Sequence, residues 1–215
     1  MEAGHKMYVR MGSWTDDLIK EYFADTSGNQ YMVDGDSYQG DLTYFGTLPE
    51  YWTPATGRGY VCRTNNPFTA WHELSNLCWT INQPATNLPA SITNRVPIRE
   101  WARYFATYMC LESQEAGYAC PNDPRGDELK LYADPTTRQF YLIAWDMSNL
   151  MDNKGANSAG DGYIWDYAKP AGAGLVISNF LYNPPIVPLY LGGVIDTMEN
   201  VLSPQNVDEI MDGMG

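Results

Sequence analysis

The sequence predicts an α+β fold that is mainly helical, with short strands and a β-hairpin. Apolar residues recur at helical spacing in two long segments, residues 68 to 82 and residues 97 to 112. Two strand patterns between residues 128 and 145 flank an Asp134-Pro135 turn. No internal repeat or linker divides the 215 residues, so we expect a single domain over residues 1–215.

The first elements expected are a helix and two short strands. Ser13 should cap the helix, because two aspartates follow it in the first turn, where the positive end of the helix dipole favours them. Gly28 should end this segment, and strands are expected at Tyr31 to Val33 and at Tyr60 to Arg63. The expected apolar stripe of the helix is Leu18, Ile19, Tyr22 and Phe23.

Two core helices should follow. The first covers residues 68 to 82, and the proline-containing stretch from Pro84 to Pro89 should break it. Pro97 opens the second helix, which should reach Glu112. The apolar positions of the first are Trp71, Leu74, Leu77, Cys78 and Ile81, and those of the second are Ile98, Trp101, Ala102, Phe105, Tyr108 and Met109. Aromatic stripes of this kind indicate core packing rather than a cofactor site.

Two helices should close the chain. One is expected from Val187 to Leu202, after the tandem prolines Pro184 and Pro185. The next should begin at Ser203-Pro204, because serine is a favoured N-cap and proline fits the first helical turn.

Composition excludes several functions. The 26 acidic and 13 basic residues give a formal charge of −13, which would repel phosphate backbones and anionic lipid. We therefore expect no nucleic-acid partner, and no apolar run is long enough for a membrane span. The two histidines, His5 and His72, argue against a histidine-rich metal site or a serine-histidine triad. The four cysteines, Cys62, Cys78, Cys110 and Cys120, could form two disulfides or stay free.

Asp146 is the first candidate functional residue, because it directly follows the apolar run from Phe140 to Trp145. A carboxylate at the end of a buried strand needs a partner. A metal ion, a basic side chain or backbone donors could supply one, and Asp146 could instead cap a helix at residues 147 to 151. The sequence alone leaves these alternatives open.

Two further acidic segments could bind Ca²⁺. The turn from Asp34 to Asp41 contains three aspartates, and the loop from Asp152 to Gly162 is rich in Gly, Asn and Asp. The first segment lacks the spacing and the terminal Glu of an EF-hand, so a solvated turn is the alternative there. A polar loop beside the hairpin is the alternative for the second.

The spacing of three acidic residues is similar to that of phosphoryl-transfer sites. In protein kinases, one aspartate positions the attacking hydroxyl, a residue five positions later helps to hold a metal, and an aspartate after a hairpin holds the metal that bridges the phosphates. Asp123, Glu128 and Asp146 occur in this order and spacing. Magnesium prefers hard oxygen ligands, which carboxylates provide.

Several segments resemble the CotH-type spore-coat kinase family, whose members are atypical protein kinases. The resemblance is carried by Asn122-Asp123, Leu131-Tyr132-Ala-Asp134-Pro-Thr-Thr, and Phe140-Tyr-Leu-Ile-Ala-Trp-Asp146. Residues 40–46, 62–65, 71–77, 183–185 and 202–210 also look like this family, so the resemblance covers nearly the whole chain.

The resemblance implies a protein-kinase-like large lobe that uses ATP and Mg²⁺ to phosphorylate serine or threonine of a protein. It implies that Asp123 is the catalytic aspartate and that Asp146 holds the metal, with Glu128 where the family usually has asparagine. Ser148 replaces the second acidic residue of the family's Trp-Asp-Leu-Asp motif. It also implies an extracellular location or one on the cell or spore surface.

The resemblance further implies that the chain begins after the small lobe that clamps the nucleotide. Lys6 has no strand context that would make it the phosphate-contacting lysine. We therefore expect weak or no transfer by this chain alone, and a missing small-lobe chain or segment as a partner. Asp123 and Asp146 should still converge within ~8 Å in one cleft.

A noncatalytic binding module is the alternative function. The chain holds 7 Trp and 16 Tyr, and exposed aromatic side chains could bind protein or glycan. The candidate patches are Tyr51-Trp52 and Tyr163 to Tyr167.

Overall fold

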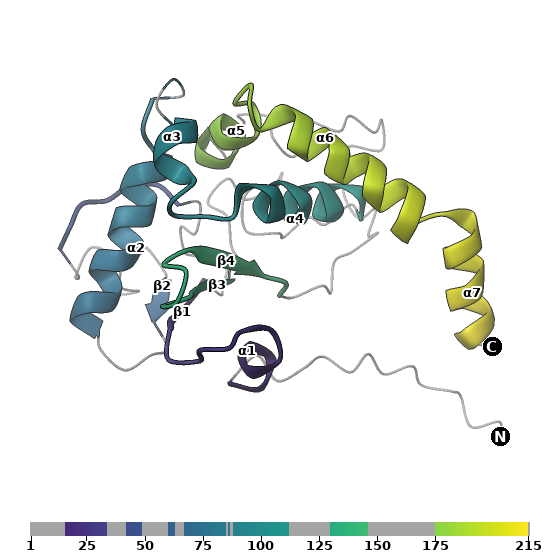
Figure 1. The fold of residues 1–215 in the computed structure, drawn as a ribbon, viewed down its shortest axis with the longest axis horizontal. Coiled ribbons are helices and arrows are strands. Elements are labelled where there is room, and N and C mark those ends of the chain that lie inside the picture. Colours follow the sequence, from purple (N-terminus) through teal and green to yellow (C-terminus); the bar gives the residue numbers. More distant parts are fainter. Residues whose placement is uncertain are drawn as a thin grey trace, which may run out of the picture.

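The computed structural model of the chain combines helices with one small antiparallel sheet (Figure 1), which confirms the predicted α+β class. It describes residues 16–33, 42–48, 60–62, 67–84, 86, 88–111, 130–145 and 175–214. Its elements are α1 (Asp16–Tyr22), β1 (Asn29–Val33), β2 (Tyr60–Cys62), α2 (Pro67–Ile81), α3 (Leu88–Ile92), α4 (Ile98–Cys110), β3 (Lys130–Ala133), β4 (Phe140–Ile143), α5 (Leu175–Leu181), α6 (Val187–Asp196), the π-helical turn η4 (Thr197–Val201) and α7 (Pro204–Met214).

The sheet has four strands in the order β2-β1-β3-β4, and each neighbouring pair is antiparallel. β1 lies in the interior of the sheet, with Tyr31 opposite Cys62 of β2 and Leu131 of β3. Among the described strands, only the β3-β4 pair is a local hairpin, so the other pairings join segments that are distant in the sequence. The strand predicted at residues 31–33 is confirmed and begins two residues earlier. The strand predicted at residues 60–63 is confirmed over residues 60–62, and Arg63 lies outside the described residues.

The hairpin turn forms at the predicted position. The Asp134 carboxylate accepts hydrogen bonds from the backbone N–H groups of Thr136 and Thr137, at 3.1 and 3.2 Å. Arg138 has a left-handed φ of 58°, and its N–H donates to the Asp134 carbonyl at 2.8 Å. Aspartate commonly binds nearby backbone in this way, which explains how this turn ends β3 and starts β4.

The two predicted core helices are confirmed as α2 and α4. Every apolar position predicted for α2 is buried, and on α4 the side chains of Trp101, Ala102, Phe105 and Tyr108 are buried. The break after α2 is shorter than predicted, because α3 begins at Leu88 and includes Pro89. Proline is tolerated there because the first turn of a helix needs no intrahelical N–H donor.

The stripe predicted for the first helix is only partly correct. Ile19 is buried, and the Phe23 ring contacts the rings of Tyr132 and Tyr141 with centroids 4.5 and 5.0 Å apart. Tyr22, however, is 70% exposed. α1 has only seven residues, so it presents a narrow face to the sheet and leaves this ring outside the contact.

The elements stack in layers. α4 lies between the sheet and α6, whereas α1 lies on the other side of the sheet (Figure 1). The predicted helix over residues 187–202 appears as α6 followed by η4. α7 then begins as predicted, since the Asn206 N–H donates to Ser203 Oγ at 3.3 Å. None of the helices among the described residues is long and apolar enough to cross a membrane.

Candidate active site at the open end of the hairpin

The three acidic residues predicted for the site, Asp123, Glu128 and Asp146, lie outside the described residues. The same is true of both candidate calcium segments and of the aromatic patches at residues 51–52 and 163–167. The predicted convergence of Asp123 and Asp146 therefore stays a prediction. The structure does describe the hairpin that lies between Glu128 and Asp146 in the sequence. It also describes the side chains that contact this hairpin.

The end of the hairpin opposite its turn is its open end. The segments that contain Glu128 and Asp146 join the sheet there. Lys130, the first residue of β3, pairs with Ile143, the last residue of β4. Glu128 comes two residues before this pair in the sequence, and Asp146 comes three residues after it. The chain thus enters and leaves the hairpin at the same end.

The residue before Asp146 is held from two sides. The Trp145 N–H donates to the Tyr108 hydroxyl oxygen at 3.2 Å. The ammonium nitrogen of Lys130 lies 3.0 Å from the centroid of the Trp145 ring, and Lys130 is only 5% exposed. A desolvated contact between a cation and an aromatic ring stabilises by about 2 kcal/mol. Trp145 therefore ties β3 and α4 to the chain just ahead of the candidate metal ligand.

α4 contacts the first residue of β4, Phe140. It contacts the chain again at Trp145, two residues beyond the end of β4. Trp101 donates from its indole N–H to the Phe140 carbonyl at 2.8 Å, and Tyr108 accepts from Trp145. These two α4 residues are seven positions apart, or about two helical turns, so they lie on one face of the helix. The stacked rings of Tyr104 and Tyr108, with centroids 4.4 Å apart, support the second contact.

Replacing Tyr108 by phenylalanine should loosen this anchor. The change removes the acceptor of the Trp145 N–H and should lower the free energy of unfolding by about 1 kcal/mol. Amide hydrogen exchange at Trp145 should become faster, while exchange in α2 should stay unchanged. Tyr22→Phe is the matched control, because Tyr22 is 70% exposed and should change neither measurement. Equal exchange at Trp145 in Tyr108→Phe and the unchanged chain would contradict the anchoring role.

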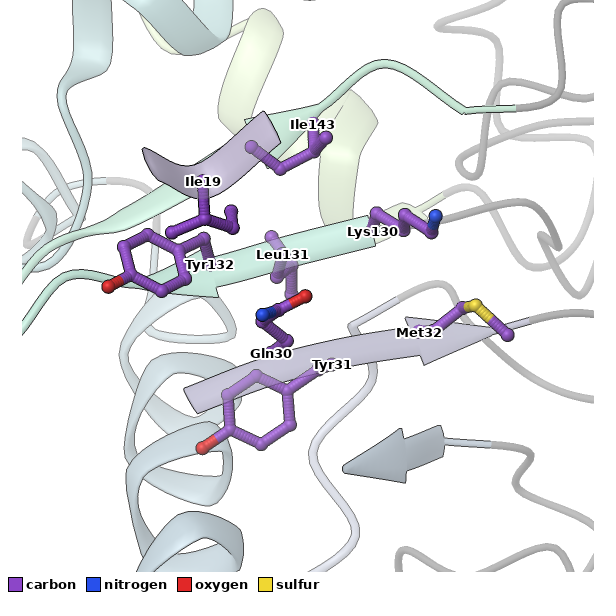
Figure 2. A pocket seen from close by; sticks show the side chains of 8 residues that line it. All are labelled: Ile19, Gln30, Tyr31, Met32, Lys130, Leu131, Tyr132 and Ile143. Carbon is purple, nitrogen blue, oxygen red and sulfur yellow. The ribbon is translucent and has the colours of Figure 1, made fainter. Parts of the chain in front are cut away.

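Lys130 was not a sequence candidate. It begins the strand Lys-Leu-Tyr-Ala, in which all four residues are buried. Figure 2 shows Lys130 on β3 at one end of the row of side chains that line a cavity between α1 and the sheet. A lysine inside a buried strand was the available signal, since lysine is almost never fully buried unless it is paired.

Two cavities lie against α1. The cavity in Figure 2 measures about 10 Å³, room for about one water molecule, so it is not a ligand site. A second cavity of about 490 Å³ lies between α1 and β4 and falls in the size range of ligand pockets. It is lined by Leu18, Tyr22, Phe23, Glu100, Tyr141, Leu142, Ile143 and Ala144. Its wall is mostly apolar and ends two residues before Asp146.

Within the described part of the chain, no group of three or more His, Cys, Asp or Glu side chains could hold a metal ion. Cys78 is buried, and Cys62 and Cys110 are half-buried. Burial raises the pKa of the Tyr31 hydroxyl, which donates to the Ala70 carbonyl at 2.5 Å as part of the core. The three predicted acidic residues lie outside that part of the chain.

Comparison with known proteins bears on the whole chain. The sequence model of a protein family, described as CotH kinase protein, matches residues 6–215. This range includes the hairpin, its α4 anchor and all three predicted acidic residues. No curated protein sequence matches the chain.

Proposed function

The chain belongs to the CotH kinase protein family, and from this premise we propose that it is a kinase-related scaffold for phosphoryl transfer. In this proposal, the phosphoryl group passes from magnesium-bound ATP to a serine or threonine hydroxyl of a protein. Asp123 is the catalytic aspartate, and Asp146 and Glu128 are the metal ligands. The described helices and sheet correspond to a protein-kinase-like large lobe.

The residue types suit this chemistry. Asp123 would orient the attacking hydroxyl and accept its proton, while the oxygen forms a bond to the γ-phosphorus and the bond to ADP breaks. Carboxylate oxygens of Asp146 and Glu128 are the hard ligands that magnesium takes. When bound, magnesium would neutralise charge on the phosphates.

One observation from the structure supports the proposal beyond family membership. The segment that leads into Asp146 is fixed by a partly buried hydrogen bond with α4 and by the Lys130 ammonium. Positioning supplies much of the catalysis in phosphoryl transfer, so a metal ligand must follow a rigid element. In this proposal, the hairpin and α4 provide this rigidity just ahead of Asp146.

Nucleotide binding can be tested by thermal unfolding of the whole chain with Mg²⁺ and ATP. A ligand present at a hundredfold excess over its Kd stabilises a protein by about 2.7 kcal/mol. For a chain of this size, each kcal/mol raises Tm by roughly 2–4 °C, so Tm should rise by roughly 5–11 °C. Asp146→Ala should abolish the shift, because it removes the proposed metal ligand.

The matched control is Asp208→Ala, which removes an exposed carboxylate from α7. It should keep the full shift with Mg²⁺ and ATP, and Mg²⁺ alone should give little shift in any variant. Transfer of the γ-phosphate to a generic substrate such as casein would then measure activity, with Asp123→Asn as the inactive comparison. A chain whose Tm does not respond to Mg²⁺ and ATP would refute nucleotide binding and leave the scaffold as a binding module.

A further inference from the structure

The carboxyl-terminal helices expose a cluster of large apolar side chains. Ile195 is 56% exposed, Met198 52%, Val201 44% and Val207 38%. The first three are spaced three residues apart, so neighbours in this series lie close together on the helix surface. We call the three residues of this series, Ile195, Met198 and Val201, the C-terminal apolar surface. Figure 1 shows α7 at the edge of the molecule, past the end of α4.

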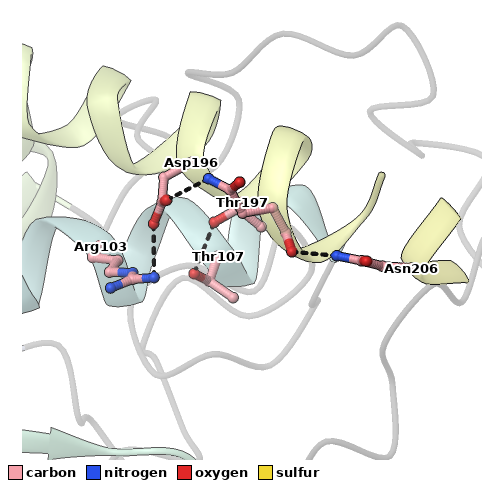
Figure 3. A network of polar contacts seen from close by, with 6 residues as sticks. Arg103, Thr107, Asp196, Thr197 and Asn206 are labelled. Atoms are coloured by element: carbon pink, nitrogen blue, oxygen red, sulfur yellow. Dashed lines mark hydrogen bonds and ion pairs between the residues drawn. The ribbon is translucent and has the colours of Figure 1, made fainter. Parts of the chain in front are cut away.

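The other side of α6 and η4 packs against α4. Tyr190, Gly193 and Thr197 are buried there, and a Cβ added at Gly193 would lie 3.0 Å from Ala106 Cβ. Figure 3 shows the polar contacts across this interface: Arg103 pairs with Asp196 at 2.7 Å, and the Thr107 and Thr197 hydroxyls lie 3.1 Å apart. The exposed apolar residues are therefore not needed to hold α6 and η4 on α4.

The segment that carries this surface has charged residues of one sign. From Asp196 to the last residue, the sequence contains five acidic residues and no lysine or arginine. Asp196 is neutralised by Arg103. The other four, Glu199, Asp208, Glu209 and Asp212, are exposed. The surface thus combines apolar side chains, including a methionine that adapts to different partners, with an acidic border.

We propose that the C-terminal apolar surface binds a basic amphipathic helix of a partner protein. Apolar side chains of such a helix would cover Ile195, Met198 and Val201, and its lysine or arginine residues would face the four exposed carboxylates. The acidic border disfavours two other occupants, a second copy of this surface and an anionic membrane, because both would bring like charges together. This binding is independent of the proposed phosphoryl transfer.

The test uses a fluorescein-labelled peptide of leucine and lysine, designed as an amphipathic helix of roughly 14 residues, about four turns. Fluorescence anisotropy with the whole chain should show saturable binding that weakens as salt screens the charges. The triple variant Ile195→Ser, Met198→Ser and Val201→Ser should bind at least about tenfold more weakly, a loss of about 1.4 kcal/mol. The triple variant Glu199→Lys, Asp208→Lys and Glu209→Lys should lose at least as much.

Two controls make the result specific to this surface. Trp79→Ser removes another exposed apolar side chain, on α2, and should leave the affinity unchanged. A peptide with the same composition but a non-amphipathic order should bind weakly to every variant. Circular dichroism should show the same helix content in all variants, because the substituted side chains are exposed.

Three outcomes would overturn the proposal. The first is an absence of peptide binding by the unchanged chain. The second is equal binding by the unchanged chain and both triple variants. The third is self-association in sedimentation that the serine variant abolishes, since this would assign the surface to a second copy. Binding that both triple variants weaken, with Trp79→Ser unaffected, supports the proposal whether or not the chain binds ATP.

Discussion

Replacing Trp101 by alanine is expected to lower the free energy of unfolding by about 3–5 kcal/mol, the usual cost of truncating a buried aromatic residue. Trp101 is fully buried, and its ring contacts Phe105 and Phe180 with centroids 6.2 and 5.8 Å apart. Its indole N–H also donates to the Phe140 carbonyl at 2.8 Å. The change therefore opens a cavity between α4 and α5 and leaves a buried carbonyl without this donor.

Urea unfolding followed by circular dichroism measures the loss. Trp101→Phe should retain most of the packing but lose the hydrogen bond, and should cost less than the alanine variant. Trp79→Ala is the matched control, because Trp79 is 51% exposed on α2 and should change stability by about 0.5 kcal/mol or less. If Trp101→Ala and Trp79→Ala cost the same, Trp101 does not hold β4 on α4.

Removal of the Trp101 side chain should also affect the candidate active site. Trp101 contacts the first residue of β4, and Tyr108 contacts the residue before Asp146. Where Trp101→Ala still folds, β4 would keep only the second of these two contacts with α4, the one between Tyr108 and Trp145. We therefore expect the Tm shift with Mg²⁺ and ATP to fall in this variant, although Trp101 contacts neither ligand.

Local patterns were enough to predict the helices and the hairpin. α2 and α4 are long, and every predicted apolar position on α2 is buried, so their periodicity carried a clear signal. Asp134 and Pro135 fixed the turn because both restrict the backbone within a few residues. The exposure of Tyr22 could not be predicted in this way, since α1 is only seven residues long.

The pairing of strands that are distant in the sequence could not be predicted from the residue pattern. The interior place of β1 depends on contacts with β2 and β3, which come about thirty and a hundred residues later, and period-two alternation does not identify a partner strand. The burial of Lys130 could not be predicted either, because it depends on the contact of its ammonium with the Trp145 ring in the folded chain. The π-helical turn η4 has no signal in the residue pattern.

The candidate site, too, could be predicted only in part from the sequence. Residue types and spacing nominated Asp123, Glu128 and Asp146, and their roles stay predictions. The support around them appears only in three dimensions, because Tyr108 is one of several aromatic residues on an apolar face of α4. Its hydroxyl gains a role only when the hairpin brings the Trp145 N–H to it.

Replacing Gly28 by alanine is expected to lower the free energy of unfolding by roughly 2–6 kcal/mol, the sum of overpacking and a lost buried hydrogen bond. A Cβ at Gly28 would lie 2.1 Å from the Ala133 carbonyl oxygen and 2.7 Å from the Tyr132 hydroxyl. The Gly28 N–H donates to that hydroxyl at 3.1 Å, which in turn donates to the Asp25 carbonyl at 2.5 Å. Relief of the clash must therefore separate β1 from β3 or break this pair of hydrogen bonds.

Gly192→Ala is the matched control, because a Cβ added there meets nothing within 4 Å. Alanine is the better helix former, so this variant should be about 0.5–1 kcal/mol more stable in urea unfolding. The two glycine variants should thus shift stability in opposite directions. A Gly28→Ala chain as stable as the unchanged one would contradict the close approach of the Gly28 backbone to Tyr132 and Ala133 of β3.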